Sequence, residues 1–130
     1  LSRGATSLVA VESSGPAAAA LSRTIAALKA SKAWQSGMQA RAMRTKAESF
    51  AAGAAGDHFD VIFIDPPYAM TTEACNALLA DLVAHGAAAS QTVIVFERST
   101  RTEALTPPAG WRITQSKAYG ETAVMYVGQE

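Results

Sequence analysis

Three groups that could hold a flat, amino-bearing ring follow an apolar run in the segment Ile62-Phe63-Ile64-Asp65-Pro66-Pro67-Tyr68. The Asp65 carboxylate can accept hydrogen bonds from an NH2 group. Pro67 restricts Pro66 to an extended conformation, which fixes the direction of the Pro66 carbonyl. The Tyr68 ring offers a stacking surface, worth about 1–3 kcal/mol per base in nucleic-acid sites. The segment predicts a clamp for a nucleobase whose exocyclic nitrogen is modified. A strand ended by an ordinary Pro-Pro turn is the alternative.

A second acid, Glu12, directly follows the short apolar run 7–11. In doubly wound nucleotide-binding folds an acid at a strand end holds ribose hydroxyls, because a carboxylate accepts two hydrogen bonds from a vicinal diol. A surface acid near a helix is the alternative. No glycine-rich phosphate loop precedes Glu12 in the chain. We expect such a loop to lie upstream of residue 1.

Strands alternate with helices along the chain, which predicts a doubly wound, mostly parallel sheet. The strands expected are 7–11, 38–45, 59–65, 92–96, 111–115 and 122–127, and the helices are 16–31 and 71–85, with a short helix or a turn at 48–55. Continuous apolar strands are typical of parallel sheets, which are buried on both faces. The last two strands, joined through 116–121, predict an antiparallel hairpin at an edge. Ligands of such sheets bind beyond the carboxyl ends of the strands, where Glu12 and Asp65 fall.

Two helices should bury apolar stripes. Within 16–31 the larger apolar residues are Leu21, Ile25 and Leu28, spaced at i, i+4 and i+7,. The helix 71–85 should be capped by Thr71 or Thr72, end at Gly86, and bury Cys75, Leu78, Leu79 and Leu82,.

Composition and charge narrow the class of protein. At 130 residues we expect one domain, residues 1–130, with no apolar run long enough to cross a bilayer,. The single cysteine, Cys75, suits a reducing cytoplasm,. His58 and His85 have no ligand partners at metal-binding spacing, so no metal site is predicted,. Seven Lys and Arg against Glu12 and Glu48 make residues 1–50 basic, which is compatible with a phosphate-facing side,.

Other polar residues leave alternatives open. Glu97 follows the strand 92–96 and either faces the ligand cleft or pairs with Arg98 or Arg101. Lys117 and Tyr119 lie on the hairpin tip and form either an RNA contact or a simple turn.

The arrangement resembles class I, S-adenosylmethionine-dependent methyltransferases, and more narrowly the RsmD family of 16S rRNA guanine-N2 methyltransferases. The matching segments run through the chain in order: 1–5, 9–12, 59–68, 93–97, 108–111 and 117–122. The Asp-Pro-Pro-Tyr segment is shared with other amino-methyltransferases, including DNA adenine enzymes. The closing segments Pro108-Ala109-Gly110-Trp111 and Lys117–Thr122 favour the RsmD type.

The resemblance implies roles for residues of this chain. Asp65 and the Pro66 carbonyl, positioned by Pro67, would hold the exocyclic amine, and Tyr68 would stack on the guanine. Cofactor binding is implied for three residues, with Glu12 on the ribose and Ala47 and Glu48 near the adenine. Contacts to substrate RNA are implied for three more: Arg98, Lys117 and Tyr119. The partner would be ribosomal RNA in the small subunit or its assembly intermediate, in the cytoplasm, with no membrane and no metal.

The chain departs from the family pattern at two places. The first strand and its glycine-rich cofactor loop are absent from these residues, and Lys46 precedes Ala47 where the family carries an acid. The alternatives to an rRNA enzyme are therefore a DNA adenine or other amino-methyltransferase with the same loop, and a non-catalytic module that binds RNA or a partner.

We expect the 130 residues by themselves not to methylate RNA, because the cofactor loop supplies much of the methyl-donor site. Isothermal titration calorimetry with S-adenosylmethionine checks this expectation, and saturable binding would contradict it.

Overall fold

The computed structural model describes residues 7–53, 58–67 and 69–130. The chain forms two compact units, Leu1–Phe50 and Ala51–Glu130, and each is described by itself. Tyr68 lies outside the described residues, so its predicted stacking role stays a prediction. No helix among the described residues has the length and apolar character needed to cross a membrane.

The first unit pairs two parallel strands, β1 (Ser7–Val11) and β2 (Gln39–Met43), in the register Ser7↔Gln39 to Val11↔Met43. Helix α1 (Gly15–Lys29) contacts β2. Its start follows from the sequence, since the Ser14 side chain accepts a hydrogen bond from the Ala17 amide and a proline stands in its first turn,.

The apolar stripe expected on α1 is only partly buried. Ala18 and Ile25 are buried, but Leu28 is 40% exposed, so its predicted place in the core is wrong. Leu28 lies in the last turn of a helix whose buried contacts are made by small and medium side chains. On β2, Ala40 is buried between the exposed Gln39 and Arg41.

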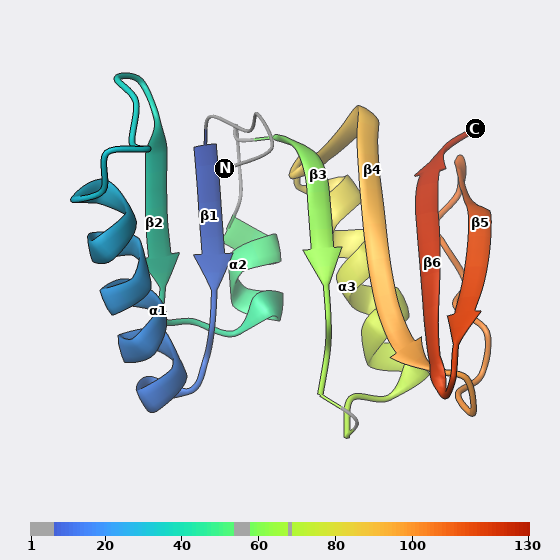
Figure 1. Cartoon of the computed structure of the whole chain (residues 1–130). Helices are drawn as coiled ribbons and strands as arrows, with labels where there is room; N and C mark the ends of the chain where they lie inside the picture. The colour runs from blue at the N-terminus through green and yellow to red at the C-terminus, as the bar shows by residue number, and fades with distance from the viewer. Residues whose placement is uncertain (1–6, 54–57, 68) are drawn as a thin grey trace. The chain divides into compact units, whose positions relative to one another are not determined.

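The second unit contains a four-stranded sheet in the order β3-β4-β6-β5 (Figure 1). Its strands are β3 (Phe59–Ile64), β4 (Ala88–Ser99), β5 (Trp111–Tyr119) and β6 (Thr122–Gln129). β3 and β4 are parallel, while β6 is antiparallel to both β4 and β5. The helices after β2 and β3 are α2 (Ala47–Gly53) and α3 (Thr72–Ala84).

The chain is a mixed α/β protein, as expected, but its described strands form two sheets where one mostly parallel sheet was expected. In the larger sheet one of the three pairings is parallel. A strand that folds back through a short turn must pair antiparallel, and β6 returns beside β4 as well as β5.

The largest differences from the predicted strand boundaries are at the start of β4 and at the end of β5. β4 begins at Ala88 because the register with β3 jumps from Phe59↔Ala88 to Val61↔Val93, and three residues bulge out between them. The Thr92 hydroxyl closes this bulge by accepting a hydrogen bond from the Ala89 amide and donating one to the Phe59 carbonyl. β5 extends to Tyr119 because the hairpin turns over only two residues, with Gly120 at φ 60°,.

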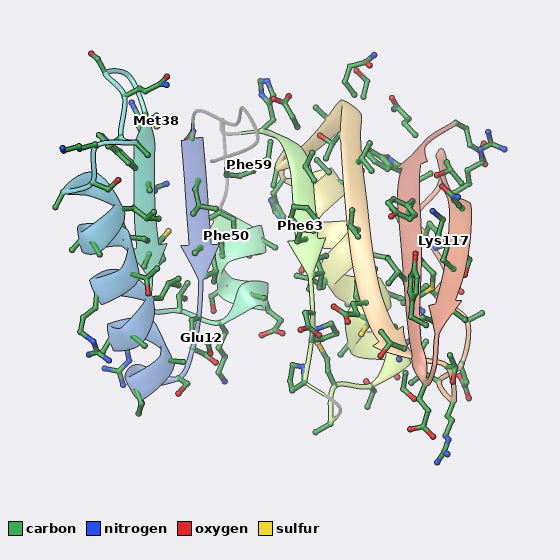
Figure 2. The ribbon with its side chains drawn as sticks, viewed as in Figure 1. Glu12, Met38, Phe50, Phe59, Phe63 and Lys117 are labelled. Atoms are coloured by element: carbon green, nitrogen blue, oxygen red, sulfur yellow. The ribbon has the colours of Figure 1, made fainter. Side chains whose placement is uncertain are left out.

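One face of the larger sheet carries the core. The predicted stripe of α3 is confirmed, since Cys75, Leu78, Leu79 and Leu82 are all buried, and Ile94 and Phe96 of β4 are fully buried. The opposite face is open. Its exposed apolar side chains include Phe63, which is 79% exposed (Figure 2). Val61 and Val93 are also exposed.

Leu79→Ala should lower the free energy of unfolding by about 2–5 kcal/mol, because it removes buried methyl groups and leaves a cavity under the sheet. Urea unfolding followed by circular dichroism measures this loss. Phe63→Ala is the control in the same unit, and we expect it to change stability by no more than about 1 kcal/mol. Equal losses in the two variants would contradict the assignment of the core to the α3 face.

Candidate functional site

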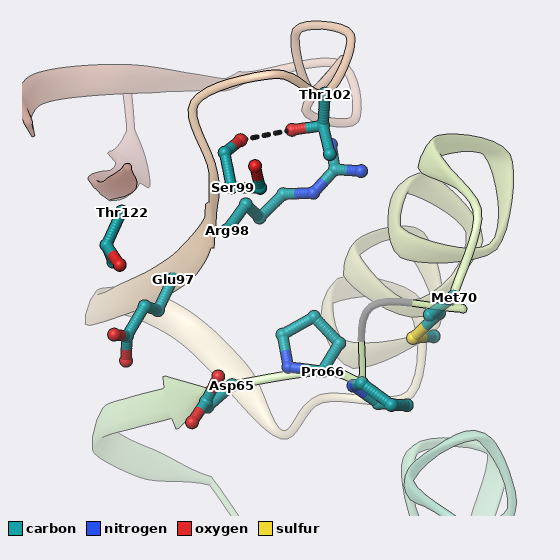
Figure 3. A pocket seen from close by; sticks show the side chains of 9 residues that line it. Asp65, Pro66, Met70, Glu97, Arg98, Ser99, Thr102 and Thr122 are labelled. Carbon is teal, nitrogen blue, oxygen red and sulfur yellow. Dashed lines mark hydrogen bonds between the residues drawn. The ribbon is translucent and has the colours of Figure 1, made fainter. Parts of the chain in front are cut away.

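A pocket of about 370 Å³ opens at the carboxyl ends of β3 and β4, within the second unit (Figure 3). Its volume is in the range of small-ligand sites, roughly 300–1,000 Å³. It is lined by Asp65, Pro66, Pro67, Met70, Glu97, Arg98, Ser99, Thr102 and Thr122. Four residues predicted from the sequence to act in a site therefore line one pocket: Asp65, Pro66, Pro67 and Arg98.

The segment after β3 leaves two acceptors available. The Met70 amide donates to the Pro67 carbonyl at 3.0 Å and closes a turn over the residues between them. The Pro66 carbonyl and the Asp65 carboxylate have no hydrogen-bond or ion-pair partner among the described residues. Because Asp65 is exposed and Pro66 half-buried, both can receive hydrogen bonds from a ligand in the pocket.

Glu97 lies beside Asp65 on the neighbouring strand. The last parallel pair of the β3–β4 ladder is Ile64↔Phe96, and each acid is the next residue of its strand. Of the two expectations for Glu97, the pocket position is the one observed, and pairing with Arg98 or Arg101 is not. Arg101 instead bonds Glu121 at 2.8 Å.

Arg98 points to the other face of β4 and is 8% exposed. Its guanidinium donates to the Glu103 carbonyl and to the Thr72 hydroxyl, both at 2.9 Å. It thereby ties the end of β4 to the first residue of α3 and to the loop 99–110. Burial raises the pKa of the Cys75 thiol, and the Arg98 charge opposes that rise. Two protein acceptors already hold the guanidinium. The contact of Arg98 with RNA stays a prediction.

The predicted cofactor residues belong to the first unit and the start of α2. Glu12 follows β1, its amide donates to the Met43 carbonyl, and its Oε1 accepts from the Ser14 amide at 3.0 Å (Figure 2). These bonds fix the carboxylate at the carboxyl end of the parallel pair while leaving its second oxygen without a partner among the described residues. Ala47 and Glu48 are exposed at the first turn of α2.

The remaining predicted RNA contacts lie on the β5–β6 hairpin. Lys117 and Tyr119 are exposed near its turn, Tyr119 at 61%. Tyr119 pairs with Thr122, which lines the pocket from the other strand of the hairpin. The hairpin end and the pocket are therefore adjacent.

Sequence reasoning missed several lining residues, namely Met70, Ser99, Thr102 and Thr122. None stands in a motif, and only the pairing of β4 with β6 brings Thr122 opposite Ser99. Within the part of the chain that the structure describes, no three His, Cys, Asp or Glu side chains gather as a metal site.

Arg98→Met should lower the free energy of unfolding by about 2–4 kcal/mol, because the Glu103 carbonyl and the Thr72 hydroxyl lose their donor. Arg101→Met is a matched control three residues away. Its ion pair with Glu121 is about 80% exposed on both sides, so its loss should cost no more than about 1 kcal/mol,. Urea denaturation compares the two variants, and equal midpoints would refute the bracing role of Arg98.

Solved structures from several bacteria share this fold. A candidate methyltransferase of Escherichia coli, yhhF, superposes with a TM-score of 0.82 at 24% identity, covering 98% of this chain and 66% of its own. A conserved hypothetical protein of Streptococcus pyogenes gives 0.82 at 27% identity, covering 99% and 75%. An rRNA methylase of Escherichia coli gives 0.51 at 14% identity, covering 96% and 57%. No curated protein matches the chain in sequence.

The chain thus spans about two thirds to three quarters of the two more similar structures, and its fold is one that methyltransferases use. A family model described as "Conserved hypothetical protein 95" matches residues 1–128, nearly the whole sequence. The chain belongs to this family of conserved proteins.

Proposed function

We propose that the protein methylates the exocyclic N2 amine of a guanine in small-subunit ribosomal RNA, with S-adenosylmethionine as methyl donor. Two kinds of finding support this proposal. The fold is shared with proteins named as methyltransferases, one of them an rRNA methylase. The observation that carries it is the pair of available acceptors, the Asp65 carboxylate and the Pro66 carbonyl, at one mouth of a base-sized pocket.

Hydrogen bonds to these two acceptors would make the N2 nitrogen of guanine a better nucleophile. The N2 lone pair of guanine is delocalised into the ring, so the nitrogen is a weak nucleophile. Hydrogen bonds from its two protons to Asp65 and Pro66 would localise the lone pair and fix its direction. When N2 forms its new bond to carbon it must lose one proton, and Asp65 would accept it.

The first unit fits the methyl donor in one respect. The Glu12 carboxylate is oriented by the Ser14 amide and retains an oxygen for the ribose hydroxyls,. Ala47 and Glu48 would contact the adenine. S-adenosylmethionine would supply an electrophilic methyl group: as N2 bonds to that carbon, the carbon–sulfur bond would break and S-adenosylhomocysteine would leave.

The proposal includes a partner and a setting. The chain would act as one methyltransferase-like domain on ribosomal RNA, in the small subunit or an assembly intermediate, in the cytoplasm. Lys117 and Tyr119 on the hairpin beside the pocket would contact the RNA, and Tyr68 would stack on the base. Arg98 would support that surface.

Asp65→Asn should reduce methyl transfer at least about 100-fold in the protein expressed from its complete reading frame, because the amide cannot take the proton. Small ribosomal subunits, naked 16S rRNA and duplex DNA would each be incubated with labelled S-adenosylmethionine. Nuclease digestion and mass spectrometry would then identify the methylated nucleoside, with N2-methylguanosine expected from RNA.

Asp60→Asn is the matched control, an exposed carboxylate of the same strand that does not line the pocket. It should keep wild-type activity. N6-methyladenine in the DNA would refute the proposal in favour of a DNA adenine enzyme. Absence of any labelled product would leave the non-catalytic binding module as the better account.

A further inference from the structure

Glu97 is a further hydrogen-bond acceptor in the pocket. The two protons of an amine need only two acceptors, and Asp65 and the Pro66 carbonyl already provide them. We infer that its carboxylate accepts the N1–H of the target guanine and thereby selects guanine over adenine. This inference rests on the proposed N2 methylation and names the residue that reads the base.

The β3–β4 register places Glu97 on the same face of the sheet as Asp65. Side chains alternate along a strand, and the alternation of exposure continues one residue beyond the end of β3: Phe63 and Asp65 are exposed and Ile64 between them is half-buried,. Phe63 pairs with Val95, and Glu97 follows two residues later on the same face of β4. Neighbouring strands are about 4.8 Å apart, so the two carboxylates can reach adjacent atoms of one ring. Figure 3 shows them on the same side of the pocket.

The Glu97 carboxylate has no cation to neutralise it among the described residues. Arg98 also lines the pocket, but its guanidinium donates to the Glu103 carbonyl and the Thr72 hydroxyl and forms no ion pair with Glu97. Arg101 is paired with Glu121. An exposed acid in such a position has its lone pairs free for a donor in the pocket.

The donors of guanine match the acceptors of the pocket in number. The Watson–Crick edge of guanine carries three N–H donors, two on N2 and one on N1. The pocket offers three groups that only accept and have no partner among the described residues: the Asp65 carboxylate, the Pro66 carbonyl and the Glu97 carboxylate. The hydroxyls of Ser99, Thr102 and Thr122 also line it, and each can accept or donate,. An ionised carboxylate can only accept.

Adenine has two N–H donors on its amine but an acceptor at N1. Asp65 and Pro66 would hold that amine equally well, so they do not identify the base. Glu97 would then face an acceptor and remain unpaired, which is a strong basis for rejecting a ligand. Glu97 on β4 therefore distinguishes guanine from adenine, while Asp65 and Pro66 after β3 bind the amine.

The test uses 2,6-diaminopurine, which keeps the N2 amine but has an acceptor at N1. The experiment first maps the guanine that the wild-type protein methylates. Ribosomal RNA is then assembled by ligation with guanine or 2,6-diaminopurine at that position. The protein from its complete reading frame should prefer guanine by at least about 10-fold in kcat/KM. Glu97→Gln, whose amide can donate to N1, should reduce this preference by about 10-fold or reverse it.

Two further variants keep the outcome interpretable. Glu121→Gln removes the same charge outside the pocket and should retain the guanine preference. Glu97→Ala removes the acceptor without adding a donor, and should also lower the preference. Activity of the Glu97 variants on 2,6-diaminopurine shows that they are folded.

The possible failures are distinct. If the wild-type protein methylates guanine and both Glu97 variants keep its preference, the role of Glu97 is refuted while the proposed function stands. If the wild-type protein forms no N2-methylated product with either base, the proposed function fails and the inference fails with it.

Discussion

The parallel pairing of β3 with β4, in the register that sets Ile64 opposite Phe96, is the constraint on which the pocket depends. It delivers Asp65 and Glu97 side by side at the ends of two strands. Because side chains alternate along a strand, a slip of one residue on β4 would bring Arg98 beside Asp65 in place of Glu97. An acid and a guanidinium would then form an ion pair, and the pocket would lose its unpaired acceptors.

The register is held from the buried face. Ile94 and Phe96 pack under α3, so burying them fixes which residues of β4 face outward,. At the far end of the ladder, Thr92 bonds across to the Phe59 carbonyl and closes the bulge. At the near end, Arg98 fastens β4 to α3 and to the loop beyond it. The polar end of the sheet is thus positioned by its apolar interior.

The features that could be predicted from the sequence are those that depend on residues close together in the chain. The cap at Thr71, the stripe of α3 and the acceptors of the Asp65–Pro67 segment could all be predicted from neighbouring residues. The β5–β6 hairpin could also be predicted from its turn, but nothing local indicates that β6 pairs with β4 on its other side. The position of Thr122 in the pocket could therefore not be predicted from any motif. The orientation of Glu97 also escaped prediction, since it depends on which face of β4 is buried.

The open face of the larger sheet has a consequence for the behaviour of the protein in solution. Phe63 and Val61 lie on β3, which is an edge strand of that sheet and is rich in apolar residues. Such an edge can add a strand from any extended apolar chain that it meets. The formal net charge is zero at pH 7, so no long-range repulsion keeps copies apart near neutrality,. Within the second unit, the strand that leads to Asp65 therefore also carries the most exposed of the large apolar side chains, Phe63.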